Sequence, residues 1–416
     1  MPQSYVIIGD GISGSSAAET LREEDSDAEI TVLTDEGEPL YNRILIKEFA
    51  KGKLPEAPIS IHEEEWYEER EIDLELNTHV TQVDADAREV HAHDGSVYEY
   101  DKLLVATGGT PASLSSFGVG NADADGIDHF WTFQDARRIR EHAEEARTGV
   151  VVGAGLLGID FAAVCGAQGI DAKYLMRGNR WWRYALSLEG AEIIHDGLRE
   201  MGVEPVFDSG VDRFEVDDDG HVTAAVDPNG ERFECDWAGV AIGLDFNVEL
   251  LDGTGVEADG TGIVVDEYMQ TGVEDIYAAG DITRFHDVLL GDRGQNGSWG
   301  SAKEQGQVAA RNMVADDEVE EFRWVSSYSI THFDFPFLSF GHPTEGEEYV
   351  EKSYGDGEWR RVALKNGKVI GGVLIGDLAP QQKLKQCIRE ERHVGDQTEV
   401  LLEEQIDLEQ LAPAQQ

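Results

Sequence analysis

The sequence predicts an α/β protein with two similar strand–turn–helix units and a smaller C-terminal α+β segment. Glycine-rich stretches at residues 9–14 and 153–158 each follow a short apolar run and open a helical pattern. Both have the spacing Gly-x-Gly-x-x-Gly, in which the glycines allow a tight turn and a close approach of the backbone to a ligand. From about residue 324 the pattern changes to short strands rich in aromatic and β-branched residues. We therefore expect two Rossmann-like, three-layer ββα dinucleotide-binding domains followed by a small α+β domain.

The first unit is expected at residues 5–35, as a strand, the glycine-rich turn, a helix and a second strand. The N-terminus of that helix offers unpaired N–H groups and the positive end of a dipole to a pyrophosphate. Asp35 follows the second strand, where an acidic residue in this kind of unit accepts hydrogen bonds from a ribose diol. A solvated surface Asp is the alternative in so acidic a chain. The apolar run at 103–109 is expected to return the chain to the first sheet.

The second unit begins near Val150, and its second strand is expected at 172–176. Strand-like segments at 203–240 complete this unit, and a further strand at 276–281 is followed by a helix at 301–314. Two glycine-rich sites in one chain suggest two dinucleotides held against each other. That is the plan of a flavoprotein that a nicotinamide reduces.

The composition is strongly acidic. The chain of 416 residues has 33 Lys and Arg against 84 Asp and Glu, which gives a formal net charge of −51. Self-repulsion of that size destabilises a compact state at low salt, whereas the screening length falls to about 3 Å at about 1 M salt. We interpret the charge as a halophilic adaptation to high salt. The absence of a basic stripe argues against a nucleic-acid partner.

The cysteine pattern and the hydropathy bear on the compartment. Cys165, Cys235 and Cys387 are far apart and form no closely spaced pair, which fits a reducing intracellular compartment. No apolar run approaches the roughly 20 residues that span a bilayer, and no signal peptide is expected before the first strand. No spacing of His, Cys and Asp suggests a metal site. We expect a cytoplasmic protein with neither a membrane nor a metal partner.

Further motifs accompany the two glycine fingerprints in a fixed order. They are Asp35, the stretches 39–43 and 106–108, and, after the second fingerprint, the stretches 241–243, 276–281 and 298–306. Together these motifs resemble the FAD-dependent pyridine nucleotide–disulfide oxidoreductase superfamily over nearly the whole chain. The branch that they resemble contains ferredoxin, rubredoxin and putidaredoxin reductases and the flavin module of assimilatory nitrite reductases.

The resemblance implies three domains. A discontinuous FAD-binding domain is expected at residues 1–112 and 238–323. An NAD(P)-binding domain is expected at 113–237, and the C-terminal α+β domain at 324–416. These boundaries imply that the second glycine-rich unit is inserted into the first.

The resemblance also implies the residues that hold a non-covalently bound FAD. They are Gly9, Gly11, Ile12, Ser13, Gly14, Asp35, Arg43, Ala106, Thr107, Gly108, Gly280, Asp281, Glu304 and Gln305, with Trp299 at the isoalloxazine ring. Arg43 would reach the pyrophosphate, since a guanidinium suits paired phosphate oxygens. The alternative for Trp299 is a core aromatic. The second dinucleotide would be held by Gly153, Gly155, Leu156, Leu157, Gly158 and Gly243.

One ion pair could act directly on the flavin. In related reductases a Lys near the flavin N5 pairs with a Glu in the helix after the second fingerprint. Asp160 takes the acidic position here, and Lys47 is the nearest candidate partner. A buried, paired Lys would raise the electron affinity of the flavin. The alternative is that Lys47 lies on the surface beside Glu48.

The superfamily's redox disulfide is absent, since no Cys occurs in residues 1–164. Disulfide reduction by the usual route is therefore excluded. Hydride transfer from the nicotinamide to the flavin remains, followed by electron delivery to an external acceptor. The expected acceptor is a small redox protein of the ferredoxin or rubredoxin type. The alternatives are a diaphorase or quinone reductase, and a nicotinamide-sensing protein that resembles apoptosis-inducing factor. A homodimer is the base-rate expectation.

Three arginines favour NADPH over NADH as the electron donor. Arg177, Arg180 and Arg183 follow the strand that ends at Met176, where NAD-binding units often have an acidic residue. A 2′-phosphate would pair with Arg and be repelled by an acid. Salt bridges to surface acids are the alternative. Gly158, where NADP-preferring units often have Ala, argues for NADH.

The C-terminal segment offers an aromatic stretch at residues 332–337. It is expected either to form the core of the small domain or to wall the far face of the flavin, and the core is favoured for most of these rings. His332 and His286 are candidates for gating protons. A structural role is the more common one for a lone His.

Overall fold

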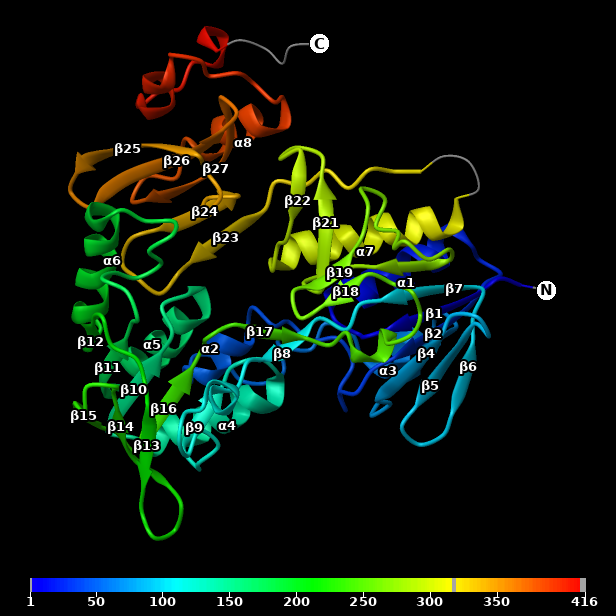
Figure 1. Ribbon diagram of the computed structural model, residues 1–416, viewed down its shortest axis with the longest axis horizontal. Helices are drawn as coiled ribbons and strands as arrows, with labels where there is room; N and C mark the ends of the chain where they lie inside the picture. The colour runs from blue at the N-terminus through cyan, green and yellow to red at the C-terminus, as the bar shows by residue number, and fades with distance from the viewer. Residues whose placement is uncertain (1, 316–318, 412–416) are drawn as a thin grey trace. The chain divides into compact units, whose positions relative to one another are not determined.

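The computed structural model describes residues 2–315 and 319–411, and their contacts divide the chain into two compact units. Unit 1 comprises Met1–Asn42, Ala57–Thr110 and Asp245–Ser326, and unit 2 comprises Arg43–Glu56, Pro111–Leu244 and Ser327–Gln416. In Figure 1 the chain is coloured from blue at the N-terminus to red at the C-terminus, so the segments of each unit can be followed. Each unit contains one of the glycine fingerprints. The predicted α/β class is confirmed, and the predicted boundaries of three domains remain a proposal.

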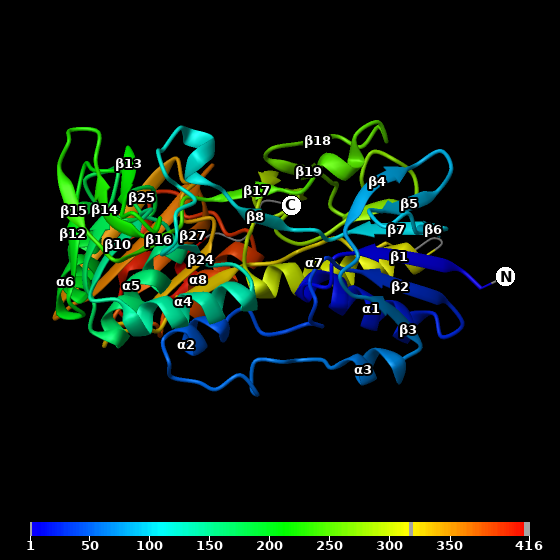
Figure 2. The same ribbon diagram turned by 90° about the horizontal axis from the view of Figure 1, so that it is seen from below.

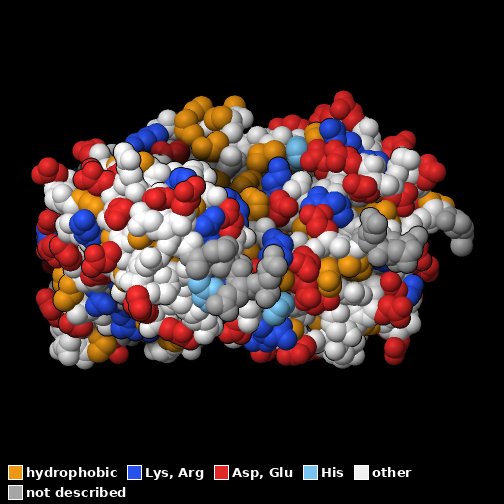
Figure 3. Space-filling model, turned by 90° about the horizontal axis from the view of Figure 1, so that it is seen from above, with side chains coloured by type: hydrophobic (Ala, Val, Ile, Leu, Met, Phe, Trp, Pro, Cys, Tyr) orange, Lys and Arg blue, Asp and Glu red, His pale blue; other side chains and the backbone are white. Residues whose placement is uncertain are grey.

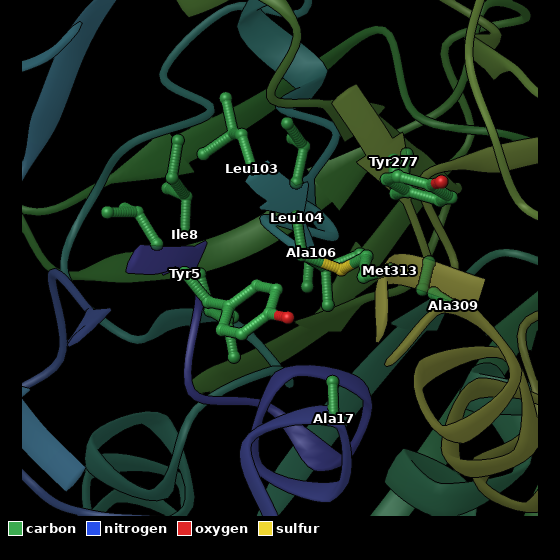
Figure 4. Close-up of a cluster of buried hydrophobic side chains, with 14 of the residues drawn as sticks. Tyr5, Ile8, Ala17, Leu103, Leu104, Ala106, Tyr277, Ala309 and Met313 are labelled. Atoms are coloured by element: carbon green, nitrogen blue, oxygen red, sulfur yellow. The ribbon is translucent and has the colours of Figure 1, made fainter. Parts of the chain in front are cut away.

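Unit 1 is built on a five-stranded parallel sheet of order β20-β7-β1-β2-β3. Its strands are β1 (Ser4–Ile8), β2 (Glu29–Leu33), β3 (Ile72–Glu75), β7 (Lys102–Val105) and β20 (Ile276–Ala278). Helices α1 (Ile12–Glu24) and α7 (Trp299–Val314) pack against each other, and Figure 2 shows α1 beside β1 and β2. Figure 4 shows part of the core, where Leu104, Tyr277 and Met313 come from β7, β20 and α7.

A second layer of strands covers this sheet. It consists of β4 (Val80–Asp84), β5 (Glu89–Ala92) and β6 (Val97–Glu99), which pair antiparallel. Val80, Val83 and Val90 join the core of the parallel sheet, and this completes the predicted three-layer arrangement. A further sheet contains β18 (Ala258–Asp259), β19 (Gly262–Val264), β21 (Thr283–Asp287) and β22 (Asp292–Gly294). Helix α3 (Glu64–Glu68) precedes β3.

Unit 2 repeats this plan with a parallel sheet of order β12-β11-β10-β16-β9. Its strands are β9 (Ile127–His129), β10 (Thr148–Val152), β11 (Asp171–Leu175), β12 (Val203–Val206) and β16 (Trp237–Val240). The helices are α2 (Ile46–Ala50), α4 (Phe133–Glu145), α5 (Leu156–Gln168) and α6 (Leu188–Glu200). An antiparallel sheet of β13 (Arg213–Val216), β14 (Val222–Val226) and β15 (Arg232–Glu234) shares a core with β10 and β11.

The C-terminal part of unit 2 is an antiparallel sheet of order β23-β24-β27-β26-β25. Its strands are β23 (Ser327–Ile330), β24 (Phe337–Gly341), β25 (Glu348–Gly355), β26 (Glu358–Lys365) and β27 (Lys368–Ile375), followed by α8 (Gln381–Arg389). This confirms the predicted α+β class of the segment. The rings of Phe333 and Phe335 stack at 4.9 Å and lie against Gly197 of α6, which is outside the C-terminal sheet. The choice between a domain core and a wall of the flavin stays a prediction.

Short elements complete the described part of the chain. Strands β8 (Gly109–Pro111) and β17 (Leu244–Phe246) pair where the chain passes from one unit to the other. Single turns of 3-10 helix occur at Leu114–Phe117, Glu249–Leu251, Thr398–Leu402 and Leu408–Gln410. Figure 3 shows acidic side chains spread over the face that it draws. None of the helices in residues 2–315 and 319–411 combines the length and hydropathy needed to span a bilayer.

Candidate functional site

The first glycine loop joins β1 to α1. Two of its glycines are packed against backbone atoms, and the third has free space beside it. Gly9 has a φ of +107°, and a Cβ atom there would lie 2.3 Å from the carbonyl oxygen of Ala106. A Cβ at Gly14, in the first turn of α1, would lie 1.9 Å from the carbonyl oxygen of Gly9. Gly11 caps α1 without a side-chain hydrogen bond, and a Cβ there would meet no atom within 4 Å. Packing therefore requires Gly9 and Gly14, whereas Gly11 keeps space open before the helix N-terminus.

Most of the predicted FAD contacts of unit 1 follow the strands of one sheet. Gly9 follows β1, Asp35 follows β2, Ala106 follows β7 and Gly280 follows β20. Because these strands are parallel, their carboxyl ends meet at one edge of the sheet. Asp35 is exposed at this edge, and its Oδ2 atom lies 3.9 Å from Nδ1 of His79.

The start of α1 carries an unsatisfied hydroxyl. Ile12 and Ser13 form the first turn, and the Oγ atom of Ser13 is buried with no hydrogen-bond partner among the described residues. A Cβ at Gly280 would lie 3.2 Å from Cβ of Ser13, and a Cβ at Gly306 would lie 2.1 Å from its carbonyl oxygen. The end of β20 and helix α7 therefore close around this turn. A partnerless hydroxyl beside uncapped N–H groups fits an anionic group such as the pyrophosphate of FAD.

Gln305 holds the turn that carries Asp281. Its Oε1 atom accepts hydrogen bonds from the backbone N–H of Gly280 at 2.8 Å and from the hydroxyl of Thr283 at 2.7 Å. Its Nε2 atom donates to Oγ of Ser301 at 3.3 Å. The side chain of Gln305 is completely buried. Contact of Gln305 with FAD stays a prediction, and the structure gives its side chain a role in shaping the turn after β20.

The other predicted contacts of unit 1 lie on α7 and after β7. Trp299 begins α7 and is half-buried, and Glu304 lies 3.7 Å from the guanidinium of Arg311. The hydroxyl of Thr107 donates to the carbonyl of Asn247 at 3.1 Å. Gly108, the next residue, has a φ of +56°. Trp299 and Glu304 thus lie on a helix, whereas Thr107 and Gly108 lie in the connection between β7 and β8. Their contacts with FAD remain predictions.

A buried carboxyl inside the first loop was not predicted from the sequence. Both carboxylate oxygens of Asp10 lie 2.8 Å from the hydroxyl of Tyr67, which donates to them, and Oγ of Ser15 lies 3.2 Å from the same hydroxyl. Burial raises the pKa of Asp10 from its usual 3.8 to about 7, against the lowering effect of the bonds from Tyr67 and Leu40, and Glu36 adds to the rise. Burial also raises the pKa of Tyr67. Tyr67 lies 57 residues from Asp10 in the sequence, so no local pattern could pair them.

This carboxyl makes the stability of the FAD-free protein pH-dependent. The pKa of Asp10 is higher in the folded than in the unfolded chain, so its contribution is present at low pH and is lost as the pH rises through about 7. Between about pH 5.5 and about pH 8.5 we expect it to remove about 2 kcal/mol from the free energy of unfolding. Asp10→Asn should abolish this loss, measured by denaturant titration. Parallel stability–pH curves for the two proteins would contradict the assignment.

The second glycine loop, between β10 and α5, has the same arrangement. Gly153 has a φ of +113°, and a Cβ there would lie 2.0 Å from the carbonyl oxygen of Ala241. Gly155 caps α5 without a side-chain bond, and a Cβ there would meet nothing within 4 Å. Leu156 and Leu157 form the first turn of the helix. The loop therefore offers a second uncapped helix N-terminus with open space before it.

The third glycine of this loop is required by packing. A Cβ at Gly158 would lie 2.0 Å from the hydroxyl of Tyr174, which donates to the carbonyl of Gly153 at 2.7 Å. An Ala at this position would displace that hydroxyl. Gly158 thus has a reason to be Gly that is independent of the coenzyme, which removes its value as an argument for NADH. Gly243, after β16, has a φ of +126°.

The three predicted arginines lie in the loop after β11 and form no ion pair with Asp or Glu among the described residues. Arg180 donates to the carbonyls of Leu186 at 2.7 Å and Arg183 at 2.9 Å, so it holds the loop itself. Arg183 is exposed and donates to the hydroxyl of Tyr184 at 2.7 Å. Arg177 is exposed, and its side chain makes no hydrogen bond to any of the described residues. The salt-bridge alternative is therefore not seen in the structure.

A second unsatisfied hydroxyl lies beside these arginines. The Oγ atom of Ser209 is buried without a partner in the described chain. The backbone N–H of Ser209 donates to the carbonyl of Met176 at 3.0 Å, and a Cβ at Gly210 would lie 3.4 Å from Cγ of Arg177. The loop after β12 therefore borders the loop after β11. The sequence offers no motif that singles out Ser209.

The predicted ion pair is formed inside unit 2. The Nζ atom of Lys47 lies 3.4 Å from Oδ1 of Asp160, and the two side chains are 13% and 6% exposed. The same Oδ1 atom accepts a hydrogen bond from Nε2 of His332 at 2.6 Å. The Nδ1 atom of His332 lies 3.0 Å from Nζ of Lys51, which is ion-paired with Glu48. Lys47 is thus buried against Asp160, and its action on a flavin remains a prediction.

Arg43, the last predicted FAD contact, also lies in unit 2. It donates to the carbonyl of Trp131 at 2.8 Å, and its guanidinium carbon lies 5.5 Å from the centroid of that ring. Its predicted bond to the pyrophosphate stays a prediction. Within residues 2–315 and 319–411, no group of three or more His, Cys, Asp or Glu side chains is arranged to hold a metal ion.

Known protein families match two long segments of the chain. Residues 3–306 match the family of pyridine nucleotide-disulphide oxidoreductases, and residues 329–392 match the rubredoxin NAD+ reductase C-terminal domain. The ferredoxin–NAD(+) reductase component of the anthranilate 1,2-dioxygenase system of Burkholderia cepacia is 31% identical, over 78% of this chain and 79% of that protein.

Two further matches extend over almost the whole chain. The NAD(P)H nitrite reductase of Bacillus subtilis is 25% identical over 96% of this chain, which spans only 48% of that relative. The structure of the covalent putidaredoxin reductase–putidaredoxin complex superimposes with a TM-score of 0.90 at 24% identity, covering 98% of this chain and 97% of that one. This likeness establishes the fold.

Proposed function

The chain belongs to the pyridine nucleotide-disulphide oxidoreductase family, and we propose that it transfers electrons from NAD(P)H through FAD to a small redox protein of the ferredoxin type. Family membership confirms the predicted oxidoreductase class and the pairing of FAD with NAD(P)H. FAD supplies the acceptance of a hydride and the release of single electrons. The protein supplies binding, orientation and charge.

The observation that carries the proposal is the repetition of one glycine loop in both units. Gly11 and Gly155 each stand before an uncapped helix N-terminus with open space in front of them. Each loop can take the pyrophosphate of one dinucleotide. Ser13 adds to the first loop a buried hydroxyl that has no partner among the described residues, and this loop is the one predicted to hold FAD.

The cysteines support an external electron acceptor. Cys165, Cys235 and Cys387 are free and buried, and burial raises the pKa of Cys165 and of Cys235 to about 12 and that of Cys387 to about 11. None of these thiols is a thiolate at neutral pH, so none can act as a redox nucleophile. Electrons must therefore leave for an acceptor outside the chain. The match to a rubredoxin reductase C-terminal domain and the likeness to a ferredoxin reductase component support a small redox protein.

For the coenzyme, we propose a preference for NADPH. The guanidiniums of Arg177 and Arg183 are exposed, and neither has an acidic partner among the described residues, although the chain is rich in acids. A Cβ at Gly178 would lie 2.9 Å from Cδ of Arg183, so the stem of Arg183 lies against the residue that follows Arg177. The two guanidiniums can therefore approach one phosphate together.

An anaerobic titration of the purified protein in molar salt tests the proposal. We expect the protein to contain FAD and the flavin absorbance to bleach with stoichiometric NADPH, and at higher concentrations with NADH. Ferricyanide, a one-electron acceptor, should then restore the absorbance. A protein without flavin, or a flavin that neither nucleotide reduces, would contradict the reductase function. A reduced flavin that persists in the presence of one-electron acceptors would favour a nicotinamide-sensing role.

A further inference from the structure

A chain of hydrogen bonds links Asp160 to the partly exposed Glu48. Oδ1 of Asp160 accepts from Nε2 of His332 at 2.6 Å, and Nδ1 of His332 lies 3.0 Å from Nζ of Lys51, which pairs with Glu48. Lys47 completes the group at 3.4 Å from the same Oδ1 atom. We call these five residues the Asp160 cluster. They come from α2 and the residue after it, from α5, and from the connection between β23 and β24, all within unit 2.

The neighbours of His332 determine which of its nitrogens carries the proton. A carboxylate only accepts hydrogen bonds, so Nε2 must carry a proton to bond with Asp160. An ammonium only donates, so Nδ1 must be bare to accept from Lys51. The imidazole is therefore neutral, in the Nε2–H tautomer, and both of its nitrogens are satisfied.

The cluster is balanced in charge and almost closed to water. The cations of Lys47 and Lys51 face the anions of Asp160 and Glu48, with the neutral ring between them. The side chains of Lys51 and His332 are 3% and 1% exposed. Burial lowers the pKa of Lys51, and the bond to Glu48 opposes this effect. Charges buried in this way contribute little net stability, because their desolvation offsets their attraction.

Two phenols and one further lysine act on the cluster from outside it: Tyr328, Tyr174 and Lys53. Nζ of Lys47 lies 5.7 Å from the centroid of the Tyr328 ring on β23. Burial raises the pKa of Tyr328 well above its usual value, with Asp160 and Tyr174 adding to the rise. Burial likewise raises the pKa of Tyr174 on β11. Both phenols stay neutral, so the charge around Asp160 is set by the five residues of the cluster, with Lys53 acting on Lys51 from outside it.

We propose that His332 and Lys51 are positioning residues that fix Asp160 as an oriented carboxylate and thereby hold the Lys47 ammonium in one place. Lys51 fixes the tautomer of His332, and the tautomer directs an N–H at Asp160. The inference rests on the proposed function and on the expectation from the family resemblance that Lys47 lies near the flavin and raises its electron affinity. His332 and Lys51 would then raise the reduction potential of the flavin without contacting it.

Four variants separate this role from others. His332→Leu removes both bonds of the ring, whereas His332→Gln keeps one donor for Asp160 and one acceptor for Lys51 but cannot carry a proton. Lys51→Met removes the donor to Nδ1. Lys53→Met is the matched control, because Lys53 is exposed and lies two residues away on the same segment. The readouts are the midpoint potential of the bound flavin and the rate of its reduction by NADPH.

We expect His332→Leu and Lys51→Met to weaken two-electron reduction of the flavin about tenfold, which corresponds to a potential about 30 mV more negative. His332→Gln should stay within about twofold of the wild type, and Lys53→Met should match it. An unchanged potential in His332→Leu would overturn the proposal. A loss in His332→Gln as large as in His332→Leu would overturn it as well, in favour of proton transfer through the imidazole.

A second readout does not depend on the flavin or the coenzyme. Nitrogen-15 NMR of the histidine-labelled, FAD-free protein should show His332 as the single Nε2–H tautomer, and Lys51→Met should lose that signature. A mixture of tautomers in the wild type would overturn the proposal. If instead NADPH fails to reduce the wild-type flavin while the single tautomer is present, the proposed function fails and the arrangement around Asp160 stands.

Discussion

Replacing Arg177 and Arg183 together by Ala should raise the KM for NADPH about 100-fold while changing the KM for NADH by no more than about threefold. A hydrogen bond to a charged group contributes about 1.5 kcal/mol at the low end, and two such bonds lost together give about 3 kcal/mol. NADH lacks the 2′-phosphate and therefore loses nothing comparable. The measurement is the steady-state rate of ferricyanide reduction with each coenzyme.

The structure supplies the control for this experiment. Arg232 lies in the same unit and is ion-paired with Glu215 and Glu234 at the surface. Arg232→Ala removes one positive charge without touching the loop after β11, so both KM values should stay at the wild-type level. Arg180 is unsuitable for this purpose, because its guanidinium holds the carbonyls of its own loop. Equal losses for NADPH and NADH in the double variant would remove the 2′-phosphate assignment.

Gly11→Ala and Gly14→Ala should both impair FAD binding, but for different reasons. A methyl group at Gly14 would lie 1.9 Å from the carbonyl oxygen of Gly9, so we expect a loss of at least about 3 kcal/mol in the free energy of unfolding. A methyl group at Gly11 meets nothing within 4 Å in the FAD-free protein. Gly11→Ala should keep its stability to within about 1 kcal/mol. It should still lose FAD affinity about 100-fold, since the methyl occupies the space before the helix.

Gly155→Ala is the counterpart of Gly11→Ala in unit 2. A Cβ at this position also meets no atom within 4 Å. This variant should purify with its yellow flavin and respond to NADPH only at much higher concentrations. Flavin content, thermal unfolding and NADPH titration distinguish the three variants. Normal FAD binding by Gly11→Ala would show that the free space beside Gly11 does not face the pyrophosphate.

Local patterns in the sequence were sufficient for much of the fold. The glycine spacing and the apolar runs indicated the loops after β1 and β10. A close approach between helix and strand requires glycines at fixed positions within a few consecutive residues, so a local pattern reveals it. Family resemblance suggested Lys47 as the partner of Asp160, although 113 positions separate the numbers of the two residues. The structure brings these two side chains together. Their role at the flavin stays a prediction.

Contacts between segments that are distant in the sequence could not be predicted from local patterns. His332 and Asp160 are separated by 172 positions, and Lys51 and His332 by 281. The bond of Tyr67 to Asp10 likewise joins separate elements. Ser13 and Ser209 stand out only because their buried hydroxyls have no hydrogen-bond partner among the described residues, and a sequence does not show this. Burial and pairing of this kind follow from tertiary packing, and a single sequence without homologues gives no signal for them.

The duplicated glycine loop also raises a problem of sorting. FAD and NADPH both carry an adenosine joined to a pyrophosphate, and the two loops offer that shared half nearly the same shape. One further means of discrimination lies in the second residue after the next strand of each unit. The carboxylate of Asp35 stands after β2 and would repel a 2′-phosphate, whereas Arg177 stands after β11 and would attract one. The opposite charges at these equivalent positions can thus keep each dinucleotide from binding in the site of the other.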